Sequence, residues 1–586
     1  KPARMTRFFS QGQWHKAPVF LRESLHPGAQ IKGPALIIEP HQTIVVEKDW
    51  RAEINGLDHV VLARTKAQTA KQAHARHADP VLLEIFNKRF MSIAEQMGLV
   101  LQNTASSVNI KERLDFSCAI FDERGHLVAN APHVPVHLGS MDRSVETIIR
   151  ANKGKIKPGD VFALNAPYNG GTHLPDITVC TPVFDAAAKK ILFWVASRGH
   201  HADVGGIAPG SMSPLATHIE EEGIYLDNLK IVAQGSFQER AILDALLTAP
   251  YPARNPAQNL ADLKAQIAAN AKGVAELHAL ISDYSWDVVR AYMGHVQDHA
   301  EARVCDLIGS LRDCSAEIET DDGAIIRVRI SVDAESRHAK VDFTGTSAQR
   351  ANNFNAPEPV TRAAVLYVFR VLAGGDMPMN AGCLRPLDII IPQGSMLSPQ
   401  YPAAVVAGNV ETSQAVTDVL FAALGRLGSA QGTMNNLTFG NRDHQYYETL
   451  CSGAPAGEGF DGVAGVHTHM TNSRLTDPEI LEMRFPVVLE DFHIRRGSGG
   501  KGKWKAGDGT SRTIRFREAM QLSILSDHRR LAPKGTLGGE DGEVGRNLLR
   551  HADGAIETLK ACDTRAVQPG DAVMIETPTG GGYGRI

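Results

Sequence analysis

The sequence has few cysteines, no long apolar run and almost no excess of charge, and each shortage excludes a class of protein. Its seven Cys form no C-x-x-C pair, which argues against a disulfide framework and against a zinc ribbon. No apolar run is long enough to cross a bilayer. The formal net charge of -4 gives no reason to expect nucleic acid or a membrane as a partner. Together these features predict a protein of a reducing, cytoplasmic compartment.

The length of 586 residues predicts several domains, because one compact core does not grow to that size. Residues 1–62 contain short β-branched runs between Gly and Pro and form too small a piece to fold robustly alone. Residues 63–78 are polar and are expected to form a linker, and residues 79–586 are expected to form the main part. The chain starts at Lys1, without an initiator Met or a signal-peptide pattern, so we expect it to be part of a longer protein.

The main part alternates helical and strand-like patterns. Asp79 and Pro80 are typical of a helix start, and apolar residues then recur at helical spacing to Leu101. Residues 257–311 are expected to form an antiparallel helical arm. Residues 359–372 and 413–427 also show helical spacing, whereas the last third is Gly-rich and β-like. The predicted fold class is α+β, a multi-domain mixture of helices and strands with a long helical arm.

Two polar segments flank a predicted β-hairpin. Asn165-Ala-Pro-Tyr-Asn-Gly-Gly-Thr-His-Leu-Pro-Asp176 precedes the first strand, and Arg198-Gly-His-His-Ala-Asp-Val-Gly-Gly206 follows the second. The start of one hairpin strand lies beside the end of the other, so these segments should meet. Two imidazoles and one or two carboxylates on a glycine-opened pocket are typical of a divalent-metal site. The alternative is that the His and Asp residues belong to ordinary polar loops.

Three further motifs have simpler interpretations than a ligand site. Gly497-Ser-Gly-Gly-Lys-Gly-Lys503 has the spacing of a phosphate-binding loop, but Trp504 stands where Ser or Thr is required, which favours a Gly-rich turn. Residues 406–413 place polar groups before a helix, where N-capping by Thr412 or Ser413 is a sufficient explanation. His467 and His469 are expected on one face of an extended segment, with structural hydrogen bonding favoured over metal binding.

Several long motifs, in order, resemble the hydantoinase B family from residue 79 to the C-terminus. They are Asp115-Phe-Ser-Cys-Ala-Ile-Phe-Asp, Gly170-Gly-Thr-His-Leu-Pro-Asp, Arg198-Gly-His-His-Ala-Asp-Val-Gly-Gly, Asn380-Ala-Gly-Cys-Leu-Arg-Pro and His467-Thr-His-Met-Thr-Asn-Ser-Arg. Pro34-Ala-Leu-Ile-Ile-Glu-Pro through Val60 resembles the final β segment of the hydantoinase A family. An A-type end joined to a B-type domain is the arrangement of 5-oxoprolinases.

The resemblance implies an enzyme that opens 5-oxo-L-proline to L-glutamate at the expense of ATP. It implies that a missing A-type domain or subunit binds ATP and Mg, so the chain should be incomplete alone, and that the protein forms a homo-oligomer. Mixed imidazole and carboxylate ligands suit Zn, Mn or Fe. The metal positions that the resemblance implies are Asp115, His173, Asp176 and His200. Asp203 or His137 is a candidate base, and His201 and Asp203 compete for places in the same site.

Other functions remain open at this point. A hydantoinase acting on hydantoin-like cyclic amides would use the same chemistry. A ketone carboxylase subunit uses the same pair of domains, although fusion of the A-type and B-type parts on one chain favours a 5-oxoprolinase. A non-catalytic assembly module with structural His clusters is the third possibility.

Overall fold

The computed structural model describes residues 1–10, 12–66 and 78–586, and the chain divides into two compact units, Lys1–Ala73 and His74–Ile586. The first unit contains a four-stranded sheet of order β1-β2-β4-β5 and a three-stranded sheet of order β3-β6-β7. A small core that includes Ala35, Ile37 and Val46 lies within it. Most of the predicted linker, residues 67–77, lies outside the described residues. The strands are β1 Arg4–Ser10, β2 Gln13–Leu21, β3 Gln30–Lys32, β4 Ala35–Ile38, β5 Thr43–Val46, β6 Trp50–Ile54 and β7 Val60–Arg64.

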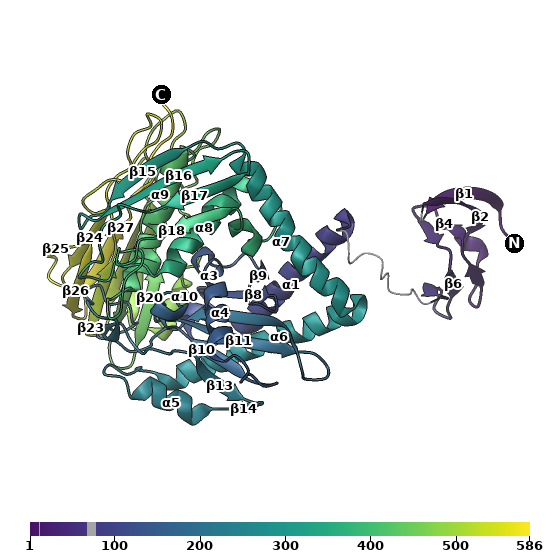
Figure 1. The fold of residues 1–586 in the computed structure, drawn as a ribbon, viewed down its shortest axis with the longest axis horizontal. Coiled ribbons are helices and arrows are strands. Elements are labelled where there is room, and N and C mark those ends of the chain that lie inside the picture. The colour runs from purple at the N-terminus through teal and green to yellow at the C-terminus, as the bar shows by residue number, and fades with distance from the viewer. Residues whose placement is uncertain (11, 67–77) are drawn as a thin grey trace. The chain divides into compact units, whose positions relative to one another are not determined.

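The second unit contains a seven-stranded sheet of order β14-β13-β10-β11-β12-β8-β9 (Figure 1). The predicted hairpin is confirmed, because β11 and β12 are antiparallel neighbours and their register pairs Asp176 with His200. Strand β8 pairs with the other edge of β12. The strands are β8 Phe116–Phe121, β9 Leu127–Asn130, β10 Val161–Leu164, β11 Asp176–Phe184, β12 Ile191–His200, β13 Leu229–Ala233 and β14 Ser236–Phe237.

Long helices cover one face of this sheet. Helix α1 starts as predicted, since Asp79 accepts hydrogen bonds from the first-turn amides and Pro80 follows it. The predicted helical arm is the pair α6 and α7, and Gln266 of α6 donates to the carbonyls of Ile177 and Ser197 in the sheet. The helices of this half are α1 Pro80–Thr104, α2 Val108–Lys111, α3 Pro135–Leu138, α4 Met141–Ala151, α5 Glu239–Leu247, α6 Pro256–Tyr284 and α7 Trp286–Ile308.

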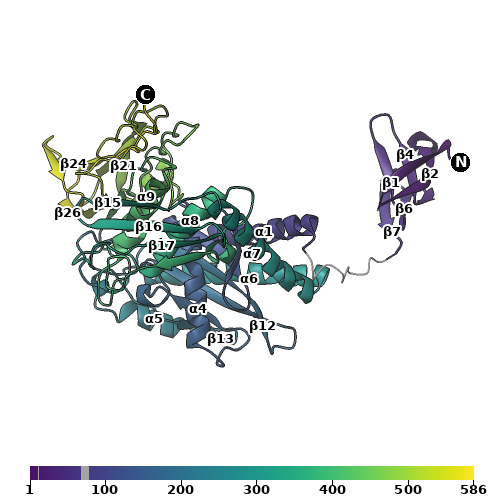
Figure 2. The ribbon, with the colours of Figure 1, turned by 45° about the horizontal axis from the view of Figure 1, so that its top comes forward.

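The C-terminal half forms further sheets around two helices, α8 Glu358–Ala373 and α9 Ser413–Leu424. Figure 2 shows the last strands gathered at one end of the unit, away from β12 and β13. One sheet has the order β15-β16-β17-β18, another β20-β19-β23-β26 and a third β21-β22-β27-β24-β25. Their elements are β15 Cys314–Glu319, β16 Ile325–Asp333, β17 His338–Asp342, β18 Leu387–Ile390, β19 Asn436–Gly440, β20 Gln445–Thr449, α10 Pro478–Arg484, β21 Val487–Ile494, β22 Thr510–Phe516, β23 Met520–Leu525, β24 Arg546–Arg550, β25 Ile556–Leu559, β26 Cys562–Val567 and β27 Ala572–Glu576.

The mixed α and β class with a long helical arm is therefore confirmed. A search of the helices across the described ranges found no segment with the length and hydropathy needed to cross a membrane. A large core joins α7, α8 and α9 to the sheet β15-β16-β17-β18, and a second core lies between α1, α6, α7 and strands β8 and β12. The face of β11, β12 and β8 that α6 does not cover carries the polar residues described next.

Candidate metal centre

Three side chains from the two ends of the β11–β12 hairpin form a compact buried cluster. One ligand atom from each of His173, Asp176 and His200 lies within 4.8 Å of the others. His173 comes from the loop before β11, Asp176 is the first residue of β11, and His200 is the last residue of β12. Because antiparallel register pairs Asp176 with His200, their side chains share one face of the sheet. Each of the three is at most 2% exposed.

Asp176 is the centre of this cluster. Its Oδ2 atom lies 3.1 Å from Nε2 of His137 and 3.2 Å from Nε2 of His173. The same oxygen accepts hydrogen bonds from Asn409 Nδ2 and Thr172 Oγ1, each at 3.2 Å. Burial alone raises the pKa of a carboxyl group, but His137 and His173 outweigh it and hold the pKa of Asp176 well below its ordinary value. Asp176 is therefore an anion at neutral pH.

The donor atoms of the cluster fit a divalent transition metal. Oδ1 of Asp176 and Nε2 of His200 are buried and have no hydrogen-bond partner, which is costly unless another group satisfies them. Burial lowers the pKa of His200 to about 4, so its imidazole is neutral at physiological pH. Nδ1 of His173 lies 3.4 Å from the carbonyl oxygen of Val406, and donation to that oxygen leaves the lone pair on Nε2. Two imidazoles and one carboxylate suit Zn, Mn or Fe.

Neighbouring side chains fix the His200 ring. It stacks on Tyr447 with 4.7 Å between ring centroids and an angle of 18°. Nδ1 of His200 lies 3.1 Å from Nδ2 of Asn109. Exchange of the nitrogen and oxygen of the Asn109 amide would let Asn109 accept from Nδ1–H and leave Nε2 of His200 free to ligate. Such outer contacts set the tautomer and orientation of a ligating imidazole.

The remaining predicted residues occupy different positions. His137 joins the cluster through Asp176. Asp115 precedes β8, and its carbonyl accepts from the amide of His200 at 3.0 Å, but its carboxylate is not one of the three clustered groups. Both ring nitrogens of His201 lie 3.1 Å from amide groups of α6. Asp203 forms a 2.8 Å ion pair with Arg254 and also accepts from two glycine amides.

Asn409 was not among the residues that the sequence singled out as ligands. It lies in the π-helical turn Gly408–Thr412 that precedes α9, and its amide contacts both His173 and Asp176.

The predicted N-cap at Thr412 or Ser413 is wrong. The hydroxyl groups of these residues donate to the carbonyls of Phe354 and Asn409, and neither accepts from a helix amide. A π-turn is a frequent feature of functional sites, but residues 406–413 give no clear sequence signal for one.

The interpretation of His467 and His469 as same-face residues of a strand is also corrected. His469 has a φ of 58°, so the backbone turns between the two. His467 contacts Thr449 at 3.3 Å, whereas His469 lies 3.4 Å from Asp418. The two imidazoles therefore belong to different polar groups.

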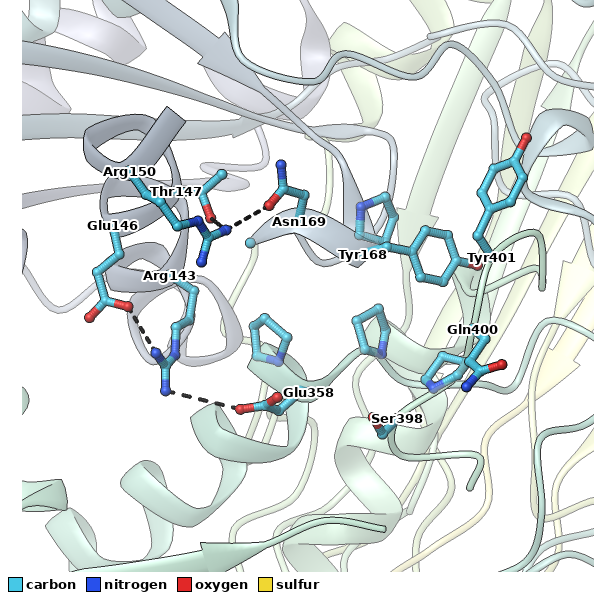
Figure 3. Close-up of a pocket in the computed structure, with 15 residues that line it drawn as sticks. Arg143, Glu146, Thr147, Arg150, Tyr168, Asn169, Glu358, Ser398, Gln400 and Tyr401 are labelled. Atoms are coloured by element: carbon cyan, nitrogen blue, oxygen red, sulfur yellow. Dashed lines mark hydrogen bonds and ion pairs between the residues drawn. The ribbon is translucent and has the colours of Figure 1, made fainter. Parts of the chain in front are cut away.

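An open pocket of about 440 Å³ lies on the outer side of the loop that leads to His173 (Figure 3). Gly170 lines it, and the Gly170 carbonyl accepts from Ser144 at 2.7 Å. Gly170 has a φ of 92°, and a Cβ there would lie 2.5 Å from the Arg143 carbonyl oxygen. Both arginines drawn in the pocket have partners: Arg143 forms an ion pair with Glu146, and Arg150 donates a hydrogen bond to Asn169.

Comparison with known proteins identifies the family of the chain. The family described as hydantoinase B/oxoprolinase matches residues 79–586, and the hydantoinase/oxoprolinase C-terminal domain matches residues 3–64. The chain is 46% identical to 5-oxoprolinase 1 of Arabidopsis thaliana over all of its length and 48% of that protein. It spans about half the length of the curated 5-oxoprolinases that it matches.

Two solved structures have the same fold. The ATP-dependent caprolactamase of Pseudomonas jessenii superposes with a TM-score of 0.79 at 25% identity, covering 87% of this chain and 92% of that one. Acetone carboxylase in its nucleotide-free form gives a TM-score of 0.77 at 16% identity, covering 88% of this chain and 77% of that one. The hydantoinase B/oxoprolinase family matches most of the length of this chain, and the chain therefore belongs to that family.

Proposed function

We propose that this chain is the hydrolase part of an ATP-dependent 5-oxoprolinase, which opens the lactam of 5-oxo-L-proline to give L-glutamate. The observation that carries the proposal is the 46% identity to a 5-oxoprolinase along the whole chain, combined with the buried His173, Asp176 and His200 cluster. We further propose that an A-type domain or subunit supplies the sites for ATP and Mg.

The chemistry of a lactam explains why two parts would cooperate. Amide resonance makes the carbonyl a poor electrophile, and the ring nitrogen is a poor leaving group. Transfer of a phosphoryl group to the carbonyl oxygen removes that resonance. A divalent ion held by His173, Asp176 and His200 would supply Lewis acidity and lower the pKa of water at the site. The low-dielectric surroundings of these buried side chains strengthen every charge interaction made there.

His137 is the residue that we assign to proton transfer. Its Nε2 atom lies 3.1 Å from Oδ2 of Asp176, and its Nδ1 atom lies 3.3 Å from Oγ of Ser117. An imidazole held against a carboxylate in this way is a common arrangement for a general base. His201 and Asp203 were equal candidates on sequence, but their partners in α6 and Arg254 favour structural roles for both.

Two alternatives use the same site. A hydantoinase would open hydantoin-like rings, and a ketone carboxylase subunit is suggested by the shared fold of acetone carboxylase. The higher identity to 5-oxoprolinases along the whole chain favours ring opening of 5-oxo-L-proline.

The test uses the chain combined with its ATP-binding part. We expect formation of L-glutamate and ADP from 5-oxo-L-proline and ATP, and a loss of about 100-fold or more in kcat for His137→Asn with its metal retained. Incorporation of labelled bicarbonate into an organic acid would instead identify a carboxylase, and opening of hydantoin but not of 5-oxo-L-proline would identify a hydantoinase.

A further inference from the structure

A second buried polar group lies beside the metal centre and is not used by the proposed hydrolysis. Its centre is Arg113, which is 0% exposed. The Arg113 guanidinium lies 4.8 Å from the ring centroid of Tyr447, the same ring that stacks on His200. Tyr447 therefore joins Arg113 to the metal centre directly.

The hydrogen bonds of Arg113 are incomplete. Nη2 donates to Oγ1 of Thr449 at 3.0 Å and to Oγ of Ser473 at 3.2 Å. Nη1 lies 3.4 Å from Oδ2 of Asp115. That distance is at the long end of the hydrogen-bond range. Nε is buried and has no partner. Within the described part of the chain, Asp115 is the one carboxylate in ion-pair distance of Arg113.

A buried arginine of β12 provides a comparison. Arg198 is also 0% exposed, but each of its three nitrogens donates to a hydroxyl group, those of Thr178, Ser140 and Ser144. Every nitrogen of the Arg198 guanidinium thus has a partner in the protein, whereas Nε of Arg113 has none. A buried unused donor is expensive unless a ligand or water accepts from it.

His467 connects this group to the surface. Its Nε2 atom lies 3.3 Å from Oγ1 of Thr449, the hydroxyl that also accepts from Arg113. The other ring nitrogen, Nδ1, is buried without a partner, although the residue as a whole is partly exposed. Burial and the nearby Arg113 lower the pKa of His467 to about 4, so its ring is neutral at pH 7. If Thr449 donates to Nε2, Nδ1 carries a hydrogen and becomes a donor.

We propose that Arg113 and His467 form the recognition site for the carboxylate of a small anionic substrate, so that these residues select acidic lactams over neutral ones. The proposal rests on the proposed function and deepens it, because 5-oxo-L-proline carries a carboxylate on the carbon next to the ring nitrogen. Nε–H of Arg113 and Nδ1–H of His467 are the unused donors available to that carboxylate. Charge-assisted bonds of this kind are short and strong, and the lactam would lie toward Tyr447 and His200.

The test compares two substrates of the intact enzyme, the chain with its ATP-binding part. These are 5-oxo-L-proline and 2-pyrrolidinone, the same ring without the carboxylate. We expect Arg113→Met to lower kcat/KM for 5-oxo-L-proline by about 100-fold or more, since it truncates one partner of a buried charge pair. The value for 2-pyrrolidinone should change by no more than about threefold, because that ring makes no charge-assisted bond to lose. Arg113→Lys should give an intermediate selectivity, because it keeps the charge but not the planar fork.

Arg198→Met is the matched control, because it removes a buried arginine that has no unused nitrogen. It should lower turnover of both lactams to the same extent. Equal loss for both substrates in Arg113→Met, with an unchanged thermal melt, would overturn the proposal. Retention of full selectivity by Arg113→Met would overturn it too.

Binding measured by calorimetry distinguishes a failure of this proposal from a failure of the proposed function. If the intact enzyme opens neither ring, the proposed function fails, but the binding of 5-oxo-L-proline and 2-pyrrolidinone to the chain still tests Arg113. Preferential binding of the acid that disappears in Arg113→Met and weakens in His467→Asn supports a carboxylate site. Equal binding of both compounds, or a preference that survives both substitutions, means that water alone satisfies these donors, and the proposal is then wrong.

Discussion

His200 and His201 are adjacent in the chain, yet their imidazoles lie on opposite sides of the sheet. His200 stacks on Tyr447 and belongs to the cluster with His173 and Asp176, whereas both ring nitrogens of His201 meet amide groups of α6. Alternation of side chains along a strand produces this separation. Two residues that the sequence presents as equivalent candidates thus have different surroundings.

This separation predicts different effects for matched substitutions. We expect the wild-type chain to bind about one equivalent of a transition metal, as three protein ligands typically do. His200→Asn should lose most of that metal with little change in fold. His201→Asn should retain the metal and lower the melting temperature, because it disturbs buried hydrogen bonds to α6. Elemental analysis and thermal melts of both variants check this. Retention of metal by His200→Asn would refute the assignment.

A buried ion pair in the C-terminal half should control stability. Arg512 donates to both oxygens of Glu448, at 2.8 and 3.0 Å, and both side chains are at most 2% exposed. We expect Arg512→Met to destabilise the fold by about 3–5 kcal/mol, because it leaves the Glu448 charge buried alone. The double variant Arg512→Met, Glu448→Gln should recover part of that loss in denaturant unfolding. If the losses of unfolding free energy in the two single variants simply add in the double variant, the two groups do not interact.

Glu222 should make stability depend on pH. It is fully buried, and burial raises its pKa from 4.5 to about 8 in spite of the hydrogen bonds that it accepts from the amides of Val405 and Val406. The folded state therefore holds a proton that the unfolded state releases, and the stability from this group is lost as pH rises from about 4.5 to about 8. Glu222→Gln keeps an acceptor for both amides and removes the charge. Its melting temperature should exceed that of the wild type at pH 8 and match it near pH 5. A constant difference across this range would contradict the assignment.

Gly170 should be required for the geometry of the loop that carries His173. An added Cβ there would meet the Arg143 carbonyl oxygen at 2.5 Å and would force a side chain onto a φ of 92°. Gly170→Ala is expected to lower both the melting temperature and the metal content. Gly425→Ala is the control, since Gly425 also has a positive φ, 60°, but no atom within 4 Å of its added Cβ. That control should cost about 1 kcal/mol and leave the metal in place. Equal metal loss in both variants would contradict the role of the contact.

The sequence predicted the parts of the fold whose signals are local. Asp79 and Pro80 marked the start of α1, and apolar spacing marked α6 and α7. Two β-rich runs joined by a short polar turn marked the β11–β12 hairpin. The hairpin was sufficient to bring His173, Asp176 and His200 together, because antiparallel pairing places a strand's start beside its partner's end.

The sequence did not reveal the contributions that come from distant elements. Asn409 reaches Asp176 across 233 positions of the chain, and Arg113 meets Thr449 across 336 positions. No short-range pattern encodes such contacts, since they depend on how separate layers pack. The choice between His200 and His201 also needed the exact end of β12, and strand boundaries are among the least certain sequence predictions.

The π-helical turn Gly408–Thr412 has a consequence for how this site responds to insertions and deletions. Such a turn contains one residue more than an α-helical turn would use. Deleting one residue from it would restore regular winding and turn Asn409 by about 100° around the helix axis relative to α9. Asn409 would then leave Asp176 while α9 and its apolar core contacts stayed in place. A single-residue deletion there would therefore take the Asn409 amide out of the site.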